Sequence, residues 1–315
     1  MSHEYLERIL KARVYDVAIE SPLEEAPRLS RRLGNAVLFK REDLQPVFSF
    51  KVRGAYNKIA HLSETIARRG VICASAGNHA QGVALAARRR GIPATIVMPQ
   101  TTPRIKVQAV IDLGGEVVLH GDEYDQAYDH ALAIARERQL TFVHPFDDPD
   151  VIAGQGTIGM EILQQQPGDT IDAIFIAVGG GGLIAGIAAW YAGRVKVVGI
   201  EPLASPTLTK ALEAGHPVDA EAGGLAADSL APRRVGEKVF PIVAKYARRT
   251  VLVSDDAIAN AQAQLWRGLR IVAEPGGAAA FSAILSGAYK PAPGERVAIV
   301  ISGGNTAAVN FDATY

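Results

Sequence analysis

Short apolar runs alternate along the chain with longer segments in which apolar side chains recur at helical spacing. The short runs indicate strands buried on both faces, and the longer segments indicate helices. The predicted strands lie at 37–40, 71–75, 94–98, 116–119, 141–144, 172–178, 195–200, 250–253 and 296–302. The predicted helices lie at 4–13, 54–62, 79–90, 103–113, 123–138, 155–165, 183–192, 255–271 and 275–286, with Val107, Val110 and Ile111 facing inward in the fourth of them.

Strands that alternate with helices at this spacing are typical of α/β proteins, in which helices cover both faces of parallel sheets. The series restarts near Val151, so the sequence predicts two α/β domains. Ligands of such sheets bind at the carboxyl ends of the strands, often between domains. Four motifs are expected at such ends: the turn around Lys51, Ser75 to His79, Gly179 to Gly182, and Ser302 to Asn305.

The turn around Lys51 carries the first candidate for chemistry. A lysine amine in such a place can form an imine with an aldehyde cofactor. Lysine and arginine together number 33, and most of them will be solvated, so Lys51 is a candidate only because of the three other motifs.

The glycine turn supports two interpretations. Gly180, Gly182 and Ala185 fit the dinucleotide pattern G-x-G-x-x-[GA], and Glu201 follows 21 residues after Gly180, where an acid would hold a ribose hydroxyl. This pattern is typical of an NAD-dependent dehydrogenase. Glycines at a helix start can equally bind a single phosphate through backbone N–H groups. These residues alone leave both interpretations open.

Composition excludes several classes of protein. Acidic and basic residues number 33 each, so no charge excess favours nucleic acid or an anionic membrane. The uncharged stretch 173–193 has the length of a membrane span, but four consecutive glycines favour strand, turn and helix instead. A single cysteine, Cys73, and an N-terminus without an apolar signal stretch favour a reducing, cytoplasmic location. The seven scattered histidines have no zinc-site spacing.

Three runs together carry a family resemblance. Lys40 to Ala55 (KREDLQPVFSFKVRGA), Ala74 to Gly82 (ASAGNHAQG) and Val151 to Thr157 (VIAGQGT) resemble the threonine/serine dehydratases, which are fold-type II pyridoxal-phosphate enzymes. The resemblance covers nearly the whole chain and is most specific up to about residue 200. Farther on, the run Glu274 to Gly277 looks like that of short, single-module serine/threonine dehydratases.

The resemblance implies a fold and a set of site residues. It implies a tryptophan synthase β-like fold, with residues 1–50 and 150–315 in a large cofactor-binding domain and residues 51–149 in a small inserted domain. It assigns pyridoxal 5'-phosphate to Lys51 as imine partner, Phe50 against the ring, Asn78 as donor to O3′, Gly179, Gly180, Gly181, Gly182 and Leu183 around the phosphate, and Ser302 facing the ring nitrogen. It assigns the substrate carboxylate to Ser75, Gly77, Asn78 and His79, with Lys51, Ser75 and Asn78 as the catalytic set and His79 structural rather than a proton carrier.

The implied reaction is the conversion of L-threonine to 2-oxobutanoate and ammonia, a step that serves isoleucine biosynthesis, with L-serine to pyruvate as a second activity. Ser302 is neutral, so it does not force protonation of the ring nitrogen, which suits prompt elimination of hydroxide. Related racemases carry a serine acid/base where this chain has Ala76, so racemisation is disfavoured. A serine-preferring dehydratase or a racemase of the same fold remains an alternative, as does the NAD-dependent dehydrogenase.

Further expectations follow from the resemblance. Glu201 could be one ligand of a structural cation, monovalent rather than divalent. The biosynthetic enzymes continue into a regulatory domain that binds isoleucine and valine, which this chain lacks, so no feedback inhibition by isoleucine is expected. The expected partner is a small amino-acid substrate, and the expected assembly is a homo-oligomer, either a dimer or a tetramer.

Overall fold

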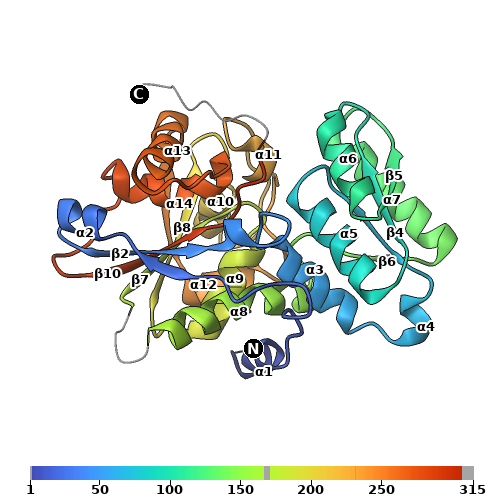
Figure 1. Cartoon of the computed structure of the whole chain (residues 1–315), viewed down its shortest axis with the longest axis horizontal. Coiled ribbons are helices and arrows are strands. Elements are labelled where there is room, and N and C mark those ends of the chain that lie inside the picture. The colour runs from blue at the N-terminus through green and yellow to red at the C-terminus, as the bar shows by residue number, and fades with distance from the viewer. Residues whose placement is uncertain (1, 167–170, 231, 307–315) are drawn as a thin grey trace.

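The computed structural model describes residues 2–166, 171–230 and 232–306, whose strands form two sheets (Figure 1). The larger sheet has the order β1-β2-β10-β7-β8-β9, and the smaller sheet has the order β5-β4-β3-β6. The larger sheet comprises β1 (Leu23–Glu25), β2 (Ala36–Arg41), β7 (Ala173–Ala177), β8 (Lys196–Pro202), β9 (Arg249–Val253) and β10 (Arg296–Ile301). The smaller sheet comprises β3 (Val71–Ala74), β4 (Ala94–Met98), β5 (Glu116–Leu119) and β6 (Thr141–Phe142).

Neighbouring strands run parallel except β1, which is antiparallel to β2. Parallel strands covered on both faces consist of nearly continuous apolar residues. Every residue of β4 and β7 is buried, in agreement with this rule. The predicted parallel sheets are therefore confirmed, and the larger sheet is mixed only at its edge.

Helices connect the strands. They are α1 (Ser2–Leu10), α2 (Pro27–Leu33), α3 (Lys51–Ala60), α4 (Glu64–Ala67), α5 (Asn78–Arg90), α6 (Arg104–Asp112), α7 (Tyr124–Arg138), α8 (Pro149–Gln165), α9 (Gly182–Tyr191), α10 (Thr207–Ala214), α11 (Ala227–Leu230), α12 (Phe240–Tyr246), α13 (Asp255–Leu269) and α14 (Pro275–Leu285), with the short 3-10 helix η1 (Glu42–Leu44) after β2.

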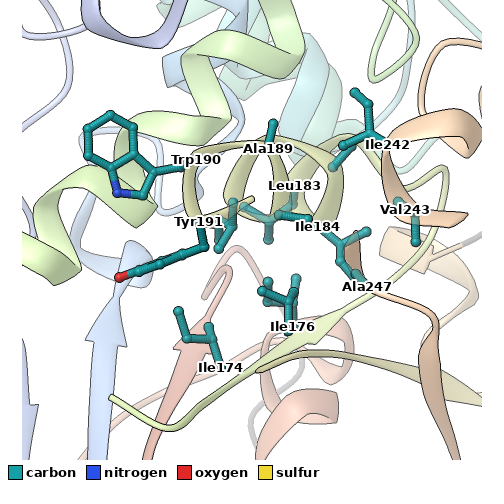
Figure 2. Packing of buried hydrophobic residues seen from close by; sticks show 14 of the residues in the cluster. Ile174, Ile176, Leu183, Ile184, Ala189, Trp190, Tyr191, Ile242, Val243 and Ala247 are labelled. Carbon is teal, nitrogen blue, oxygen red and sulfur yellow. The ribbon is translucent and has the colours of Figure 1, made fainter. Parts of the chain in front are cut away.

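Both faces of the larger sheet carry a hydrophobic core. On one face, Ile174 and Ile176 of β7 point toward Leu183 and Ile184 of α9, as Figure 2 shows. On the other face, Phe175 packs in the core formed with α13 and α14. Alternate residues of one strand thus serve two cores, which gives the three layers expected of this fold.

The smaller sheet is built in the same way and lies beside the larger one (Figure 1). Residues of α3, α5 and α6 pack on one face, and residues of α7 pack on the other. Helix α3 also contacts α8, a helix that packs against the larger sheet. Their backbones are in close contact there, because a Cβ atom at Gly154 would lie 2.8 Å from the Cα atom of Gly54. The helix that begins with Lys51 is therefore held between the two sheets.

The structure departs from the sequence predictions mainly at helix boundaries. Helix α8 begins at Pro149, six residues earlier than predicted, because the Asp148 carboxylate accepts hydrogen bonds from the first backbone N–H groups and proline suits the first turn. Ile111 is 48% exposed, so its predicted inward orientation is wrong, whereas Val110 is buried. The elements β1, α2, α4, α10, α11 and α12 were not predicted, because they are short or carry no apolar period.

The apolar stretch 173–193 folds as strand β7, a glycine turn and helix α9, as the sequence predicts. Among the described residues, no helix combines the length and the apolar character that crossing a membrane requires.

Candidate active site

The turn before Lys51 is held by the segment that follows β10. Ser49 and Gly303 form an isolated antiparallel bridge, and the Phe50 N–H donates to the Ser302 carbonyl at 3.2 Å. The Gly304 N–H donates to the Phe48 carbonyl at 2.8 Å. These bonds bring together two of the four predicted motifs, although they lie at opposite ends of the sequence.

Lys51 begins helix α3 and does not directly follow a strand, so the expectation that all four motifs sit at strand ends is wrong for this one. Its Nζ atom donates to the Pro145 carbonyl at 2.9 Å and lies 5.3 Å from the centre of the Phe50 ring. Burial lowers the pKa of Lys51 to about 8, and Glu274 opposes part of that shift. The amine therefore has a substantial uncharged fraction near neutral pH, the form that attacks a carbonyl carbon.

The loop from Ser75 to His79 connects β3 to α5 and approaches Lys51 closely. A Cβ atom on Gly82 would lie 3.2 Å from the Lys51 carbonyl carbon, so α5 contacts the start of α3 backbone to backbone. Within the loop, the Gly77 N–H donates to the Ser75 hydroxyl at 3.3 Å. The loop thus places a hydroxyl and a helix N-terminus on the Lys51 side of the smaller sheet.

His79 is buried inside this region. Its Nε2 lies 2.8 Å from the Val143 carbonyl, so Nε2 carries a proton and donates it. Burial, the nearby Lys51 charge and His144 lower the pKa of His79 to about 3, and the ring is therefore neutral. A neutral ring bonded to a backbone carbonyl supports the structural role expected for His79.

Asn78 contacts a carboxylate that the sequence did not assign. Its Nδ2 donates to Oε1 of Glu274 at 2.6 Å, and its Oδ1 accepts from Nδ2 of Asn305 at 3.0 Å. Glu274 is only 7% exposed, and burial raises its pKa to about 7. The sequence marked Glu274 only as part of a family run; a carboxylate directly before a Pro-Gly-Gly helix start was the signal that could have found it.

The glycine turn follows β7 and opens α9. Gly181 has φ of +88°, a conformation that side chains with Cβ rarely adopt. A Cβ atom on Gly182 would lie 2.9 Å from the Cβ of Phe146, and one on Gly180 would overlap the Phe146 ring. The turn is thus closed on one side by the segment Pro145–Phe146, the same segment that accepts the Lys51 hydrogen bond. The side chain of Leu183 lies in the core, so only its backbone can contribute to a site at the turn.

Ser302 lies at the end of β10. It is buried, and its hydroxyl donates to the Gly276 carbonyl at the start of α14, at 3.4 Å. Glycine at 277 allows this approach, because a Cβ atom there would overlap the carbonyl of Gly303, the residue after Ser302. The fourth predicted motif therefore meets the Lys51 turn and the Glu274 segment at one place.

Glu201 lies apart from this group. Its Oε1 accepts from the Leu208 N–H at 2.6 Å, and its Oε2 accepts from the Thr209 N–H and hydroxyl at 2.9 and 2.6 Å. The carboxylate therefore caps helix α10. The described residues include no group of three or more His, Cys, Asp or Glu that could hold a metal ion, and the monovalent cation at Glu201 stays a prediction.

Four buried charged residues, Lys40, Glu42, Arg53 and Glu161, form ion pairs with one another close to the Lys51 turn, and we call them the rear cluster. Each of its side chains is 0% exposed. Arg53 donates to both oxygens of Glu42 at 2.8 Å and to both oxygens of Glu161 at 2.5 and 2.9 Å. Lys40 donates to Glu161 at 2.6 Å. The cluster thus pairs two positive charges with two negative ones. Because Arg53 lies two residues after Lys51 in α3, these ion pairs tie α3 to β2, η1 and α8.

These features define a class of enzyme. A buried amine with a lowered pKa, placed beside a glycine turn at a helix N-terminus, suits a cofactor that carries both an aldehyde and a phosphate. The chain matches the family model described as pyridoxal-phosphate dependent enzyme over residues 14–303. It belongs to this family, and pyridoxal phosphate is its cofactor.

Solved structures place the chain among fold-type II enzymes. The processed form of threonine deaminase isoform 2 from Solanum lycopersicum superimposes with a TM-score of 0.93 at 46% identity, covering 97% of this chain and 90% of that one. Maize serine racemase superimposes with a TM-score of 0.91 at 30% identity, covering 96% and 93% of the two chains. The fold expected from the sequence is confirmed.

Curated relatives include biosynthetic threonine dehydratases. The L-threonine dehydratase biosynthetic IlvA of Burkholderia multivorans is 50% identical over 99% of this chain and 62% of the relative. The chloroplastic biosynthetic threonine dehydratase of Arabidopsis thaliana is also 50% identical, over 98% of this chain and 52% of the relative. The family resemblance is confirmed, and the chain spans about half to three-fifths of the length of these relatives.

Proposed function

We propose that this protein is an L-threonine dehydratase that converts L-threonine to 2-oxobutanoate and ammonia and also converts L-serine to pyruvate. The observation that carries the proposal is the Lys51 amine, which has a lowered pKa and bonds to the segment that closes the glycine turn. The names of the relatives supply the substrate class. They match essentially all of this chain at 46–50% identity.

The residues present fit pyridoxal phosphate. Phosphate binding at Gly179 to Leu183 is supported by the turn at the start of α9, because the first N–H groups of a helix have no partner within it and attract an anion. Contact of the ring with Phe50, Asn78 and Ser302 is supported by the hydrogen bonds that gather these residues around the Lys51 turn.

Substrate binding is assigned to the smaller sheet. We assign the substrate carboxylate to Ser75, Gly77, Asn78 and His79, since they lie at or just before the start of α5, where N–H groups favour an anion. Residues 1–50 and 150–315 would form the large domain and residues 51–149 the small domain, a division supported by the separate sheets and their separate cores.

The proposed reaction divides the work between the cofactor and the chain. When bound, pyridoxal phosphate withdraws electrons from the substrate Cα and so makes the Cα proton acidic. Lys51 removes that proton with its uncharged amine, which the lowered pKa makes available. Ser302 offers a neutral hydroxyl to the ring nitrogen and adds no negative charge there. Loss of the β-hydroxyl and then of ammonia, with one water lost and one regained, gives 2-oxobutanoate from threonine.

Lys51→Ala tests the proposal directly. The variant is expected to lose threonine deamination and to lose the visible absorbance that borohydride abolishes in the intact holoenzyme, because the bond to the aldehyde is proposed to form at Lys51. Oxoacid formation and absorbance spectra measure both effects. Full deaminase activity in the variant would contradict the proposal, and a comparison of threonine with serine as substrates would set the preference.

Racemisation is the second candidate function, because two of the similar solved structures are serine racemases. Position 76 separates the two functions, since alanine cannot transfer a proton to the face of the substrate opposite Lys51. Ala76→Ser is expected to add measurable racemisation of L-serine, which chiral chromatography detects. Clear racemisation by the unmodified protein would contradict the dehydratase assignment.

The position of Glu201 argues against the dehydrogenase interpretation, which needs this residue to bind a ribose. A ribose hydroxyl would have to reach Glu201 from a bound dinucleotide, but Glu201 is fully buried and its carboxylate holds the start of α10. The family membership also accounts for the glycine turn without a dinucleotide.

Assembly and location are part of the same proposal. We expect a homo-oligomer, a dimer or a tetramer, in the cytoplasm, and a monovalent cation near Glu201. Light scattering of the purified protein would measure the assembly, and activity in sodium or potassium compared with a bulky organic cation would test the ion.

A further inference from the structure

We propose that Glu274 is a positioning residue that turns the Asn78 amide so that its nitrogen, and not its oxygen, faces the ring oxygen of bound pyridoxal phosphate. This inference rests on the proposed placement of the cofactor ring beside Asn78. It adds a residue to which neither the family motifs nor the relatives' names assign a role.

The orientation of an amide side chain is decided by its hydrogen-bond partners. An ionised carboxylate can only accept, so the short contact of 2.6 Å between Asn78 and Oε1 of Glu274 requires the amide nitrogen on that side. The Asn305 amide donates to Oδ1 of Asn78 at 3.0 Å and supports the same orientation. Nδ2 carries two N–H groups, so one remains for the cofactor after Glu274 has taken the other.

Glu274 is itself fixed by the segment that follows β10. Its backbone N–H donates to the Gly303 carbonyl at 3.1 Å, and Pro275 begins helix α14 directly after it. A Cβ atom on Gly303 would lie 2.5 Å from Oε1 of Glu274, so only glycine at 303 leaves room for the carboxylate. Gly303 therefore leaves the space in which the carboxylate lies against Asn78.

The electrostatic surroundings leave this carboxylate able to titrate. Burial raises its pKa to about 7, the Asn78 hydrogen bond and the Lys106 and Lys51 charges lower it, and Asp228 raises it. These charged groups reach it from α3, α6 and α11. Below pH 7 the protonated acid can also donate, and then it no longer excludes the reversed amide. The contact between Asn78 and the cofactor should therefore strengthen as Glu274 ionises.

The test measures cofactor affinity and needs no substrate. Apoprotein is titrated with pyridoxal phosphate between pH 6 and pH 8, a range that spans the pKa of about 7, for the unmodified protein and for Glu274→Gln. Glutamine keeps the shape but can present either an oxygen or an NH2 group to Asn78. The dissociation constant of Glu274→Gln divided by that of the unmodified protein should be near one at the acid end of the range. It should rise to about three to ten at the alkaline end, as expected for the loss of one hydrogen bond. Because the Glu274 charge also raises the pKa of Lys51, both titrations are repeated in a Lys51→Ala background, where the ratio should show the same rise with pH.

A matched control uses a second buried carboxylate. Glu295 is 8% exposed and pairs with Lys196 away from the site, so Glu295→Gln should change stability but leave the ratio near one at every pH. If Glu274→Gln does not fold, Glu274→Asp is used instead, because it keeps the negative charge but places the carboxylate one methylene farther from Asn78. The affinity of this variant for pyridoxal phosphate should be about threefold lower than that of the unmodified protein at the alkaline end.

A ratio that does not change with pH, or an unchanged affinity in Glu274→Asp, would overturn the inference. Failure of the proposed function is distinct from either result, because it would appear as holoenzyme that binds the cofactor and does not deaminate threonine.

Discussion

Two buried carboxylates near the Lys51 turn, Glu42 and Glu274, have pKa values that are shifted in opposite directions. In the rear cluster, Arg53 and Lys40 hold Glu42 in its charged form, and the pKa of Glu42 is lowered although burial alone would raise it. Glu274 is also buried, yet its direct partner is the neutral amide of Asn78 and its pKa is raised to about 7. Desolvation acts on both carboxylates, so the bonded counter-charge makes the difference.

Glu42 therefore has the properties of a structural carboxylate, and Glu274 has those of a functional one. A buried carboxylate such as Glu42, which accepts two hydrogen bonds from the Arg53 guanidinium, remains ionised near neutral pH and ties together the elements that carry the pair. A buried carboxylate with only a neutral partner changes its charge near the pH at which the enzyme works, and such groups concentrate at functional sites.

The largest expected effect comes from breaking the rear cluster. Arg53→Met removes the cation shared by Glu42 and Glu161 and leaves buried negative charge uncompensated, which should lower the free energy of unfolding by about 3–5 kcal/mol. Urea titration followed by circular dichroism measures the loss. Arg13→Met, which breaks the exposed pair with Asp16, is the control and should cost less than about 1 kcal/mol. Similar losses in the two variants would mean that the rear cluster is not a stabilising anchor.

A smaller effect should come from Glu274, and it depends on pH. The folded-state pKa of about 7 lies above the ordinary value of 4.5, so the folded protein binds the extra proton between these values. The stability of the unmodified apoprotein should therefore fall, relative to Glu274→Gln, as pH rises through this window, by up to about 3 kcal/mol. Unfolding titrations of both proteins at several pH values give the difference. A difference that rises with pH, or stays constant, would contradict the assignment of the raised pKa.

The smallest effect concerns the amine of Lys51. The pKa of Lys51 is lowered from 10.5 to about 8, so the uncharged fraction should grow about tenfold per pH unit below that value and level off above it. The initial rate of covalent labelling of the apoprotein by pyridoxal phosphate, fixed with borohydride and located by peptide mapping, should follow the same curve. Labelling of Lys51 that is still increasing near pH 10 would show an ordinary lysine.

The sequence predicted the sheets well because parallel strands are continuous apolar runs, as β4 and β7 are. It also singled out the Lys51 turn, the Ser75 loop, the glycine turn and Ser302, since each contains residue types with restricted backbone or chemical uses, and their roles stay predictions. It could not predict Glu274, because its partner Asn78 is 196 residues away and the contact exists only after two sheets have come together. The same reason hid the segment Pro145–Phe146, whose residues contain no chemical signature.

Edge elements were missed for a different physical reason. Strand β1 has three residues, two of them glutamates, and its pairing is determined by the backbone of β2 rather than by its own side chains. Glu201 was misleading because its spacing from the glycine turn suits a ribose, whereas the fold uses it to cap α10.

The position of β10 in the larger sheet affects the order in which the chain can fold during its translation. Strand β10 is the last strand along the described chain, yet it pairs with β2 on one side and β7 on the other. A chain emerging from the ribosome can complete the smaller sheet early, because its strands lie between residues 71 and 142. The larger sheet stays divided until β10 arrives, and the turn before Lys51 gains its partners Ser302 and Gly304 at the same moment. The turn before Lys51 therefore cannot be complete until β10 has been synthesised and has entered the sheet.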